Sequence, residues 1–217
     1  LDGVPVGVKD ELDLAGYKTR VGTLFMGTEP AREDAFAVSR LRSGGALLFG
    51  KLNMHEIGIG VTGINPHYGA ARNPHDLERV TGGSSSGSAS AVAMGLCPIS
   101  VGADGGGSIR IPAALCGVAG LKPTFGRVSE HGAAPLCWSV AHVGPIGATI
   151  DDLSLAYAMM AGRDAGDPNT LWQPPLKQMA MERAAPDTIT LGVFRPWFED
   201  AQSSIVDQCE SVLTTLQ

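Results

Sequence analysis

Two runs of glycine and serine constrain this chain more than any other feature of its sequence. The first occupies residues 81–88 and the second residues 102–110. Flexible linkers are rich in the same two residue types, but these runs are flanked by apolar segments, residues 91–96 and 109–118, that are typical of a packed core. The pattern therefore argues against a linker, and a chemical role for the serines has to be considered.

Predicted strands and helices alternate along the chain. Strands are expected at residues 4–8, 46–51, 99–103 and 188–194, and helices at residues 34–42, 88–95, 149–161 and 204–216. The helix at 149–161 has the clearest signals, because Thr149 and Asp152 match a capping box and apolar residues follow at helical spacing. Residues 163–186 are expected to form a loop or linker, and the strand at 46–51 is expected to be buried. This alternation predicts α/β layers.

The composition argues against a nucleic-acid-binding protein and against a membrane-spanning protein. The chain of 217 residues is 44% hydrophobic and carries a formal charge of -6, so it has enough apolar material for a core but no basic surface for nucleic acid. Its most apolar stretch, residues 89–103, contains serine and proline and is shorter than a membrane span of roughly 18 residues. The sequence predicts no transmembrane helix, and we expect no signal peptide ahead of Leu1.

The pattern of cysteine and histidine gives no metal site. Cys97, Cys116, Cys137 and Cys209 are widely spaced, which argues against both a zinc site and a disulfide framework and favours a reducing, intracellular compartment. His55-Glu56 begins a zincin-like pattern, but Ile59 stands where the second metal ligand is needed. We therefore expect no metal.

One alternative interpretation of the first serine run is a nucleophile elbow. Residues 83–87 spell G-x-S-x-G, and His131 or His142 could supply the later histidine of a triad. Such an elbow follows a hydrophobic strand, whereas residues 73–79 are polar and include a proline. The context therefore argues against an α/β hydrolase.

Taken together, the two runs resemble the amidase signature family. The G-G-S-S-x-G-S run begins at Gly82, and D-x-G-G-S-I-R covers Asp104 to Arg110. Further segments similar to family landmarks follow in the family order: residues 3–10, 50–56, 72–74, 116–124 and 144–145. The resemblance implies a single amidase signature domain over residues 1–217, an α/β fold with a mixed β-sheet sandwiched between α-helices. Because family members begin earlier and continue further, it also implies a fragment that is incomplete at both ends.

Some segments are most similar to plant-type fatty acid amide hydrolases. They are the serines at 84–86, Asn-Pro-His-Asp at 73–76, the glycines and serine at 105–108 and the region of Trp197 and Phe198. Residues 135–139 and 142–145 instead resemble generic bacterial and fungal amidases. The substrate class implied by these segments is therefore mixed.

The resemblance implies a role for each residue of the site. It places the catalytic lysine at Lys9, a bridging serine at Ser84 and the acylated nucleophile at Ser108, and it implies a cis peptide bond between Gly83 and Ser84. Substrate contacts are expected from Ser85, Ser108 and the backbone of Gly105, Gly106 and Gly107, where small residues leave N–H groups open to an oxyanion. Asp104 and Arg110 flank the nucleophile, and a structural ion pair is at least as good an interpretation as substrate binding.

The implied activity is hydrolysis of linear carboxylic amides through an acyl-enzyme, with no metal or organic cofactor. Lys9 could act as a base in its neutral form, and its neighbours Val6 and Val8 are compatible with the burial that this requires. The leading substrates are fatty acid amides such as N-acylethanolamines.

Two other functions stay open at this point. The same signature occurs in the glutaminase subunit of tRNA-dependent amidotransferases, whose partners use the released ammonia, and the chain could also be an inactive fragment or binding module. A small-molecule amide is the expected partner, without nucleic acid. Membrane attachment would require segments outside this chain, and a homodimer is compatible with the sequence.

Overall fold

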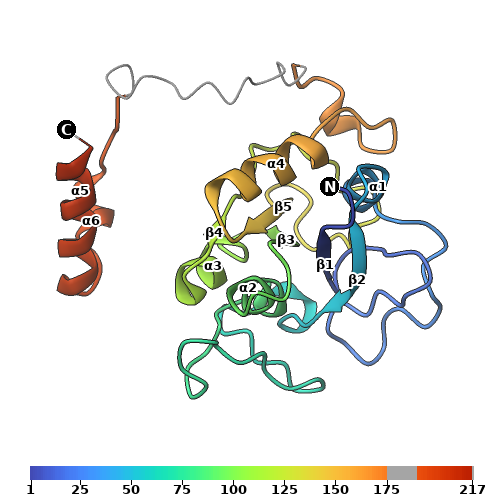
Figure 1. Cartoon of the computed structure of the whole chain (residues 1–217), viewed down its shortest axis with the longest axis horizontal. Coiled ribbons are helices and arrows are strands. Elements are labelled where there is room, and N and C mark those ends of the chain that lie inside the picture. The colour runs from blue at the N-terminus through green and yellow to red at the C-terminus, as the bar shows by residue number, and fades with distance from the viewer. Residues whose placement is uncertain (175–189, 217) are drawn as a thin grey trace. The chain divides into compact units, whose positions relative to one another are not determined.

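The computed structural model describes residues 1–174 and 190–216. The chain divides into two compact units, Leu1–Leu176 and Lys177–Gln217, and each is described by itself (Figure 1). The sequence predicted one domain over residues 1–217, and this stays a prediction.

A five-stranded mixed sheet forms the centre of the first unit. Its strands are β1 Pro5–Lys9, β2 Leu47–Leu52, β3 Ile99–Asp104, β4 Ala119–Gly120 and β5 His142–Gly147. The strand order is β2-β1-β3-β5-β4, with β1 parallel to both β2 and β3, and with β5 antiparallel to β3 and β4. Because β1 and β3 are parallel neighbours, their carboxyl ends lie at the same edge of the sheet.

Helices cover both faces of this sheet, which confirms the predicted fold class (Figure 1). They are α1 Phe36–Ser43, α2 Ser86–Ala93, α3 Arg110–Cys116 and α4 Ile150–Met160, with short 3-10 helices at Glu56–Gly58 and Pro168–Thr170. One core cluster joins Val6, Val8 and Val101 of the sheet to α1 and α4. A second joins Ile146 of β5 to α2 and α3. Side chains of a strand alternate between faces, so Lys9 lies on the face opposite Val6 and Val8, the one that α2 covers.

Small residues allow α2 to lie very close to the sheet. The Ser88 hydroxyl donates to the carbonyl of Val101 at 3.0 Å, and Ser100 of β3 donates back to the Ser88 carbonyl at 2.9 Å. A Cβ at Gly87 would lie 2.6 Å from the backbone nitrogen of Asn53, so that helix turn admits no side chain. This packing fixes the N-terminus of α2, where the first serine run ends.

Most helix predictions for this unit are confirmed to within two residues. The capping box of Thr149 and Asp152 is present at the start of α4. The first helix begins at Phe36 rather than Asp34, because the Asp34 carboxylate pairs with Arg42 and accepts from the N–H of Ala15 at 2.8 Å.

The prediction of a buried strand at 46–51 is correct for the strand but wrong for its burial. β2 is one of the two edge strands of the described sheet, and Leu47 and Phe49 are 60% and 41% exposed. An edge strand has a neighbouring strand on one side only, so its apolar side chains are more exposed to water than those of β1 and β3.

The second unit contains two helices, α5 Arg195–Phe198 and α6 Ser203–Thr215. The helix predicted at 204–216 is confirmed, although Gln202 is its N-cap and no side chain caps it. The strand predicted at 188–194 is wrong over residues 190–194, which form no strand, and residues 188–189 lie outside the described residues. Apolar residues there lead into the turn of α5, where Pro196 occupies the helix start.

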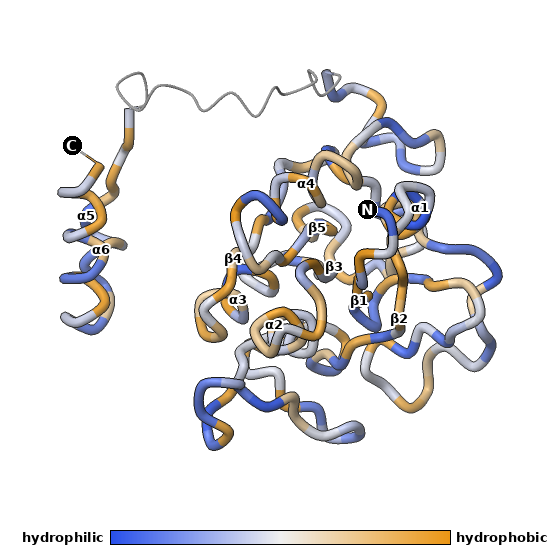
Figure 2. Tube along the Cα trace, in the orientation of Figure 1, coloured by the Kyte–Doolittle hydropathy of each residue, from blue (hydrophilic) through white to orange (hydrophobic). Residues whose placement is uncertain are grey.

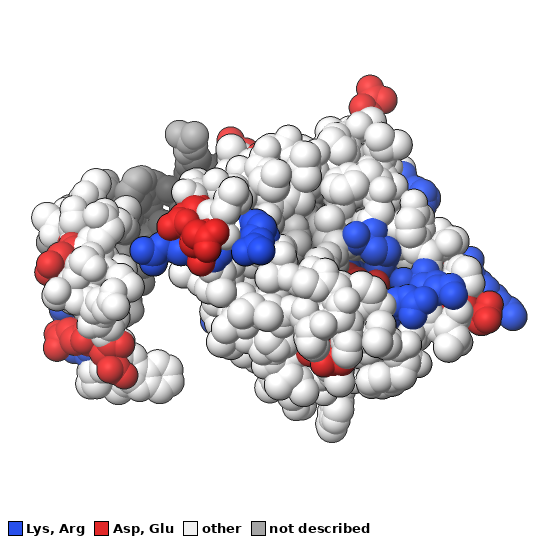
Figure 3. All heavy atoms as spheres, turned by 90° about the horizontal axis from the view of Figure 1, so that it is seen from below, with Lys and Arg blue, Asp and Glu red and all other residues white. Residues whose placement is uncertain are grey.

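The surface of the described residues is mixed in character. Figure 2 shows hydrophilic colour through much of the loop before α2, and the face drawn in Figure 3 carries charged groups of both signs on a mostly uncharged surface. Among residues 1–174 and 190–216, no helix combines the length and the apolar character that a membrane crossing requires.

Candidate active site

The site lies where β1 and β3 end and α2 begins. Lys9 is the last residue of β1, Asp104 is the last of β3, and Ser84 and Ser85 immediately precede α2. The parallel register of β1 and β3 brings the first two positions to one edge, and the packing of α2 brings the serines to the same edge. Residues far apart in sequence therefore meet because of the sheet topology.

Lys9 is buried and contacts Ser84 directly. Its side chain is 1% exposed, and Nζ donates to the Ser84 Oγ at 2.8 Å and to the carbonyl of Ala103 at 3.2 Å. Ser84 is also 1% exposed, so this hydrogen bond is shielded from water. The structure thus brings together two of the three residues predicted to react.

The backbone around Ser84 is held by the segment that follows β2. The N–H of His55 donates to the Ser84 carbonyl at 3.1 Å, and the N–H of Gly87 donates to the Asn53 carbonyl at 2.9 Å. The Gly83–Ser84 peptide bond is cis, as the resemblance predicted. A Cβ at Gly83 would lie 2.7 Å from the nitrogen of Gly63, so glycine is required for this close approach.

Ser108 is half-buried in the loop between β3 and α3. Its carbonyl accepts from the N–H of Ser85 at 3.1 Å, which ties the second serine run to the first. Within the described residues, no hydrogen bond joins the hydroxyl of Ser108 to that of Ser84. The backbones of the two runs are therefore connected, while the hydroxyl contact needed for a relay is not made in this structure.

Asp104 organises the glycine loop that carries Ser108. Its buried carboxylate accepts from the N–H groups of Gly107 at 2.7 Å and Ile109 at 3.1 Å, and from the guanidinium of Arg110 at 3.0 Å. Burial alone raises the pKa of the Asp104 carboxyl, but the hydrogen bonds from Arg110 and the backbone outweigh it and lower the pKa to about 2. The structural interpretation of Asp104 and Arg110 is confirmed.

The hydrogen bonds of Asp104 also determine which N–H groups of the loop are left without a protein acceptor and could bind an oxyanion. The N–H of Gly107 is used by Asp104, and Gly107 itself is buried. Gly105 and Gly106 are exposed, and within the described residues neither their N–H groups nor that of Ser108 donate to another protein group. Three of the four predicted oxyanion donors are therefore available, and Gly107 serves the loop instead.

Ser85 was predicted to contact the substrate, and in the structure its hydroxyl contacts the backbone of Ala103. It is fully buried, and its hydroxyl donates to the Ala103 carbonyl at 3.2 Å and accepts from the Ala103 N–H at 3.4 Å. These contacts join the start of α2 to β3. They favour a structural role for the Ser85 side chain over contact with substrate.

The histidines of the alternative elbow do not reach the serines. His142 is buried, accepts from the N–H of Gly126 through Nε2 at 2.6 Å, and has Nδ1 2.5 Å from the carbonyl of Ala141. His131 pairs with Asp164 at 3.4 Å. Among residues 1–174 and 190–216, neither histidine forms a hydrogen bond with Ser84, Ser85 or Ser86, which argues against the α/β hydrolase interpretation.

Glu11 is a member of the site that the sequence analysis missed. Its Oε2 lies 2.7 Å from the Lys9 ammonium, and the residue is 4% exposed. Its position two residues after Lys9 is a signal that could have suggested it, because the chain turns directly after β1, with the N–H of Leu12 donating to the Lys9 carbonyl at 3.1 Å, and the turn keeps Glu11 close to Lys9. The site therefore contains a buried acid beside the buried lysine.

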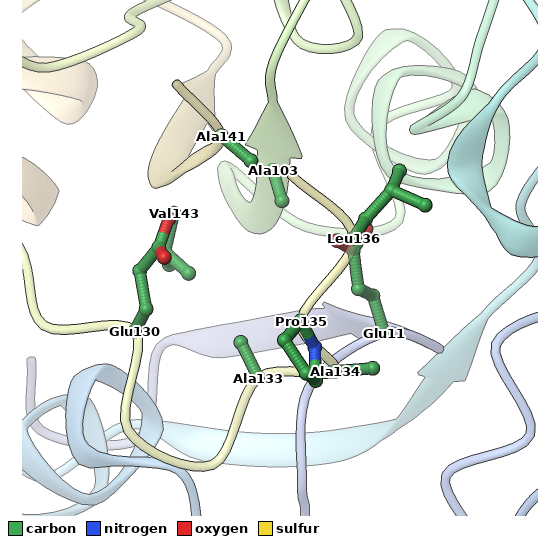
Figure 4. A pocket seen from close by; sticks show the side chains of 9 residues that line it. All are labelled: Glu11, Ala103, Glu130, Ala133, Ala134, Pro135, Leu136, Ala141 and Val143. Atoms are coloured by element: carbon green, nitrogen blue, oxygen red, sulfur yellow. The ribbon is translucent and has the colours of Figure 1, made fainter. Parts of the chain in front are cut away.

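A cavity of about 50 Å³ adjoins this pair (Figure 4). Glu11 and Glu130 contribute carboxylates to its wall, and small apolar residues form most of the rest. Its lining includes Ala103, whose carbonyl accepts from Lys9, but not Lys9 itself. Glu11 is thus the charged residue that connects the cavity to the lysine.

The comparisons with known proteins all point to amidases and related hydrolases. The amidase family profile matches residues 1–217. A fatty acid amide hydrolase of Arabidopsis thaliana is 45% identical over 222 residues, covering 100% of this chain and 37% of the relative. AtzE, which belongs to the 1-carboxybiuret hydrolase of Pseudomonas sp. strain ADP, is 46% identical over 204 residues, covering 92% of this chain and 44% of that protein.

The solved structures agree with the fold. One of them is the crystal structure of a glutamyl-tRNA(Gln) amidotransferase component from Thermotoga maritima. It is similar with a TM-score of 0.77 and 37% identity, covering 80% of this chain and 39% of that one. The chain therefore spans less than half the length of the relatives that it matches.

Proposed function

The chain belongs to the amidase family, and from that premise we propose that it carries the reacting groups of an enzyme that hydrolyses carboxylic amides. An amide carbonyl is a poor electrophile and a serine hydroxyl is a poor nucleophile. Hydrolysis therefore needs a base for the hydroxyl, donors for the developing oxyanion and an acid for the leaving nitrogen. Residues of this site can supply each of these.

The observation that carries the proposal is the buried hydrogen bond of 2.8 Å from Lys9 Nζ to Ser84 Oγ. In its neutral form Lys9 takes the proton of Ser84, while Ser84 takes the proton of Ser108. The Ser108 oxygen then attacks the amide carbon. When the tetrahedral intermediate collapses, the proton returns through Ser84 to the leaving nitrogen, and an acyl-enzyme remains on Ser108 for water to hydrolyse.

For this relay the two hydroxyls have to approach each other in the complex with substrate. Ser108 lies in a loop whose glycines at 105 and 106 are exposed, and catalytic hydrogen bonds are often long in proteins without substrate. The hydrogen bond from the Ser85 N–H to the Ser108 carbonyl keeps the two segments adjacent, so a rotation of the Ser108 side chain would be enough to change the distance between the hydroxyls.

The oxyanion would be held by the open N–H groups of Gly105, Gly106 and Ser108. Consecutive N–H groups in a turn form a concave anion site, and preorganised donors of this kind each contribute about 10²–10³ in rate. Asp104 and Arg110 act on this site indirectly, because they fix the loop through Gly107 and Ile109.

For the substrate, we propose linear amides, with long-chain fatty acid amides such as N-acylethanolamines as the first class to test. The 45% identity to the fatty acid amide hydrolase of Arabidopsis thaliana supports this choice. In the full-length protein, long-acyl amides should be hydrolysed faster than short-acyl amides, and Ser108→Ala should abolish both reactions. Hydrolysis of short-acyl amides only would overturn the fatty acid proposal and leave amide hydrolysis standing.

A second candidate is the glutaminase component of a tRNA-dependent amidotransferase. It is supported by the similarity to the glutamyl-tRNA(Gln) amidotransferase component from Thermotoga maritima at a TM-score of 0.77. This function predicts glutamine hydrolysis that partner proteins stimulate, with no turnover of long-acyl amides. If the folded full-length protein hydrolyses neither class, the chain is better described as an inactive or binding module.

A further inference from the structure

The Lys9 ammonium has a buried counter-ion that the relay itself does not require. Glu11 Oε2 lies 2.7 Å from Lys9 Nζ, and the two side chains are 5% and 1% exposed. Within the described residues, that oxygen has no hydrogen-bond donor of suitable geometry, so its contact with the ammonium is ionic. A carboxylate buried in this way is costly unless a cation accompanies it.

This contact opposes the chemistry proposed for Lys9. The relay needs a neutral amine, but an anion within 4 Å stabilises the ammonium, and the low dielectric of a buried site strengthens that effect. Lys9 must therefore lose a proton against the attraction of Glu11 before it can accept one from Ser84. The cavity of about 50 Å³ beside Glu11 can hold a water, which provides a route for that proton.

We propose that Glu11 sets the pH above which the Lys9–Ser84 relay is active, by stabilising the protonated form of Lys9. This proposal rests on the proposed function. The activating step is the transfer of one proton from the Lys9 ammonium to solvent water, and Glu11 stays a carboxylate throughout. Glu11 is a positioning residue, because it acts on Lys9 and touches neither Ser84 nor Ser108 in the described contacts.

The carboxylates of the neighbouring segments have other partners. Asp10 lies 3.5 Å from the Lys51 ammonium and Asp104 lies 3.0 Å from the Arg110 guanidinium, while Glu56 contacts the His67 ring at 2.7 Å and Glu130 lies 3.4 Å from the His142 ring. Glu130 lines the same cavity as Glu11 but makes no ion pair with Lys9. It is therefore a matched control, with the same charge and the same cavity.

The first experiment is the pH dependence of kcat/KM for one soluble amide, measured with the full-length protein. Glu11→Gln keeps the shape of the side chain and removes its charge, so the acidic limb should move to lower pH by about one unit or more. Glu11→Asp keeps the charge and should stay closer to the parent, and Glu130→Gln should shift the limb by less than half as much. An unmoved limb in Glu11→Gln, a shift to higher pH, or an equal shift in Glu130→Gln would overturn the proposal.

A second measurement separates this proposal from the proposed function. With lysine labelled by ¹³C at Cε, the Lys9 resonance is assigned by its loss in Lys9→Met and followed against pH in the parent and in Glu11→Gln. The proposal requires the Lys9 transition to move to lower pH in Glu11→Gln even if no amide is hydrolysed. Coincident transitions in the two proteins would reject the role of Glu11 whatever the activity.

Discussion

Asp104 and Arg110 form a two-point ion pair at the end of β3, with Nε and Nη2 of the arginine each 3.0 Å from a carboxylate oxygen. The same carboxylate accepts from the N–H groups of Gly107 and Ile109, on either side of Ser108. One buried anion therefore holds both flanks of the residue proposed to be acylated.

This arrangement makes stability depend on acid pH. The pKa of the Asp104 carboxyl falls from its ordinary value near 3.8 to about 2 in the folded protein, so ionisation of this group favours folding. The contribution is fully present above about pH 4 and is lost as the pH falls through about 2. Urea unfolding of the parent and of Asp104→Asn should show a difference of about 1–2 kcal/mol at pH 6 that shrinks towards pH 2. A difference that is the same at both pH values would contradict this account.

The buried pair of Lys9 and Glu11 predicts a non-additive effect on stability. Lys9→Met leaves the Glu11 carboxylate buried without a cation, which should cost about 3 kcal/mol or more. Adding Glu11→Gln removes that charge and should recover a large part of the loss. Urea unfolding of the parent, the two single variants and the double variant measures the coupling, and strictly additive losses would show that the two groups do not interact.

The close packing of α2 against the segment after β2 predicts that an added methyl group at position 87 destabilises the protein. In Gly87→Ala the new Cβ would lie 2.6 Å from the backbone nitrogen of Asn53, so α2 has to move away from the segment that holds Ser84. We expect a loss of about 2–3 kcal/mol in thermal or urea unfolding. At Gly106 a Cβ meets no atom within 4 Å, and Gly106→Ala should change stability by less than about 1 kcal/mol. Equal losses in the two variants would argue against this packing.

The four cysteines should separate into two classes of reactivity. Cys137 and Cys209 are exposed in their own units, whereas Cys97 and Cys116 are buried. Burial raises the pKa of the Cys97 thiol and raises that of Cys116 to about 11, so neither forms the reactive thiolate near pH 8. Brief treatment of the folded protein with iodoacetamide, read by peptide mass spectrometry, should label the first two and spare the second two. Rapid labelling of Cys116 would mean that α3 is not packed as described.

Local signals predicted α1, α2, α4 and α6 and part of the sheet, but not α3 or α5. The capping box at Thr149 and the apolar spacing after it are properties of neighbouring residues, and α4 follows them. The exposure of β2 could not be predicted from neighbouring residues in the sequence, because it depends on the position of the strand at an edge of the sheet. The strand expected at 188–194 is wrong over 190–194, since a short apolar run fits several structures equally well.

The site was predictable only through the resemblance to a family. Lys9 and Ser84 are separated by 75 positions, and nothing local to either residue indicates that the packing of α2 against the sheet brings Lys9 Nζ within 2.8 Å of Ser84 Oγ. The ion pair of Glu11 with Lys9 and the hydrogen bond of the Ser85 hydroxyl to the Ala103 carbonyl are side-chain contacts that the sequence analysis did not anticipate.

The central claim is that Ser108 is the nucleophile and that Lys9 activates it. The most direct test is the intact mass of the full-length protein after treatment with a fluorophosphonate, alongside Ser108→Ala and Lys9→Ala. The account predicts a single adduct that is absent in Ser108→Ala and forms more slowly in Lys9→Ala. An adduct that persists in Ser108→Ala, or no adduct at all on a protein shown to be folded, would contradict it.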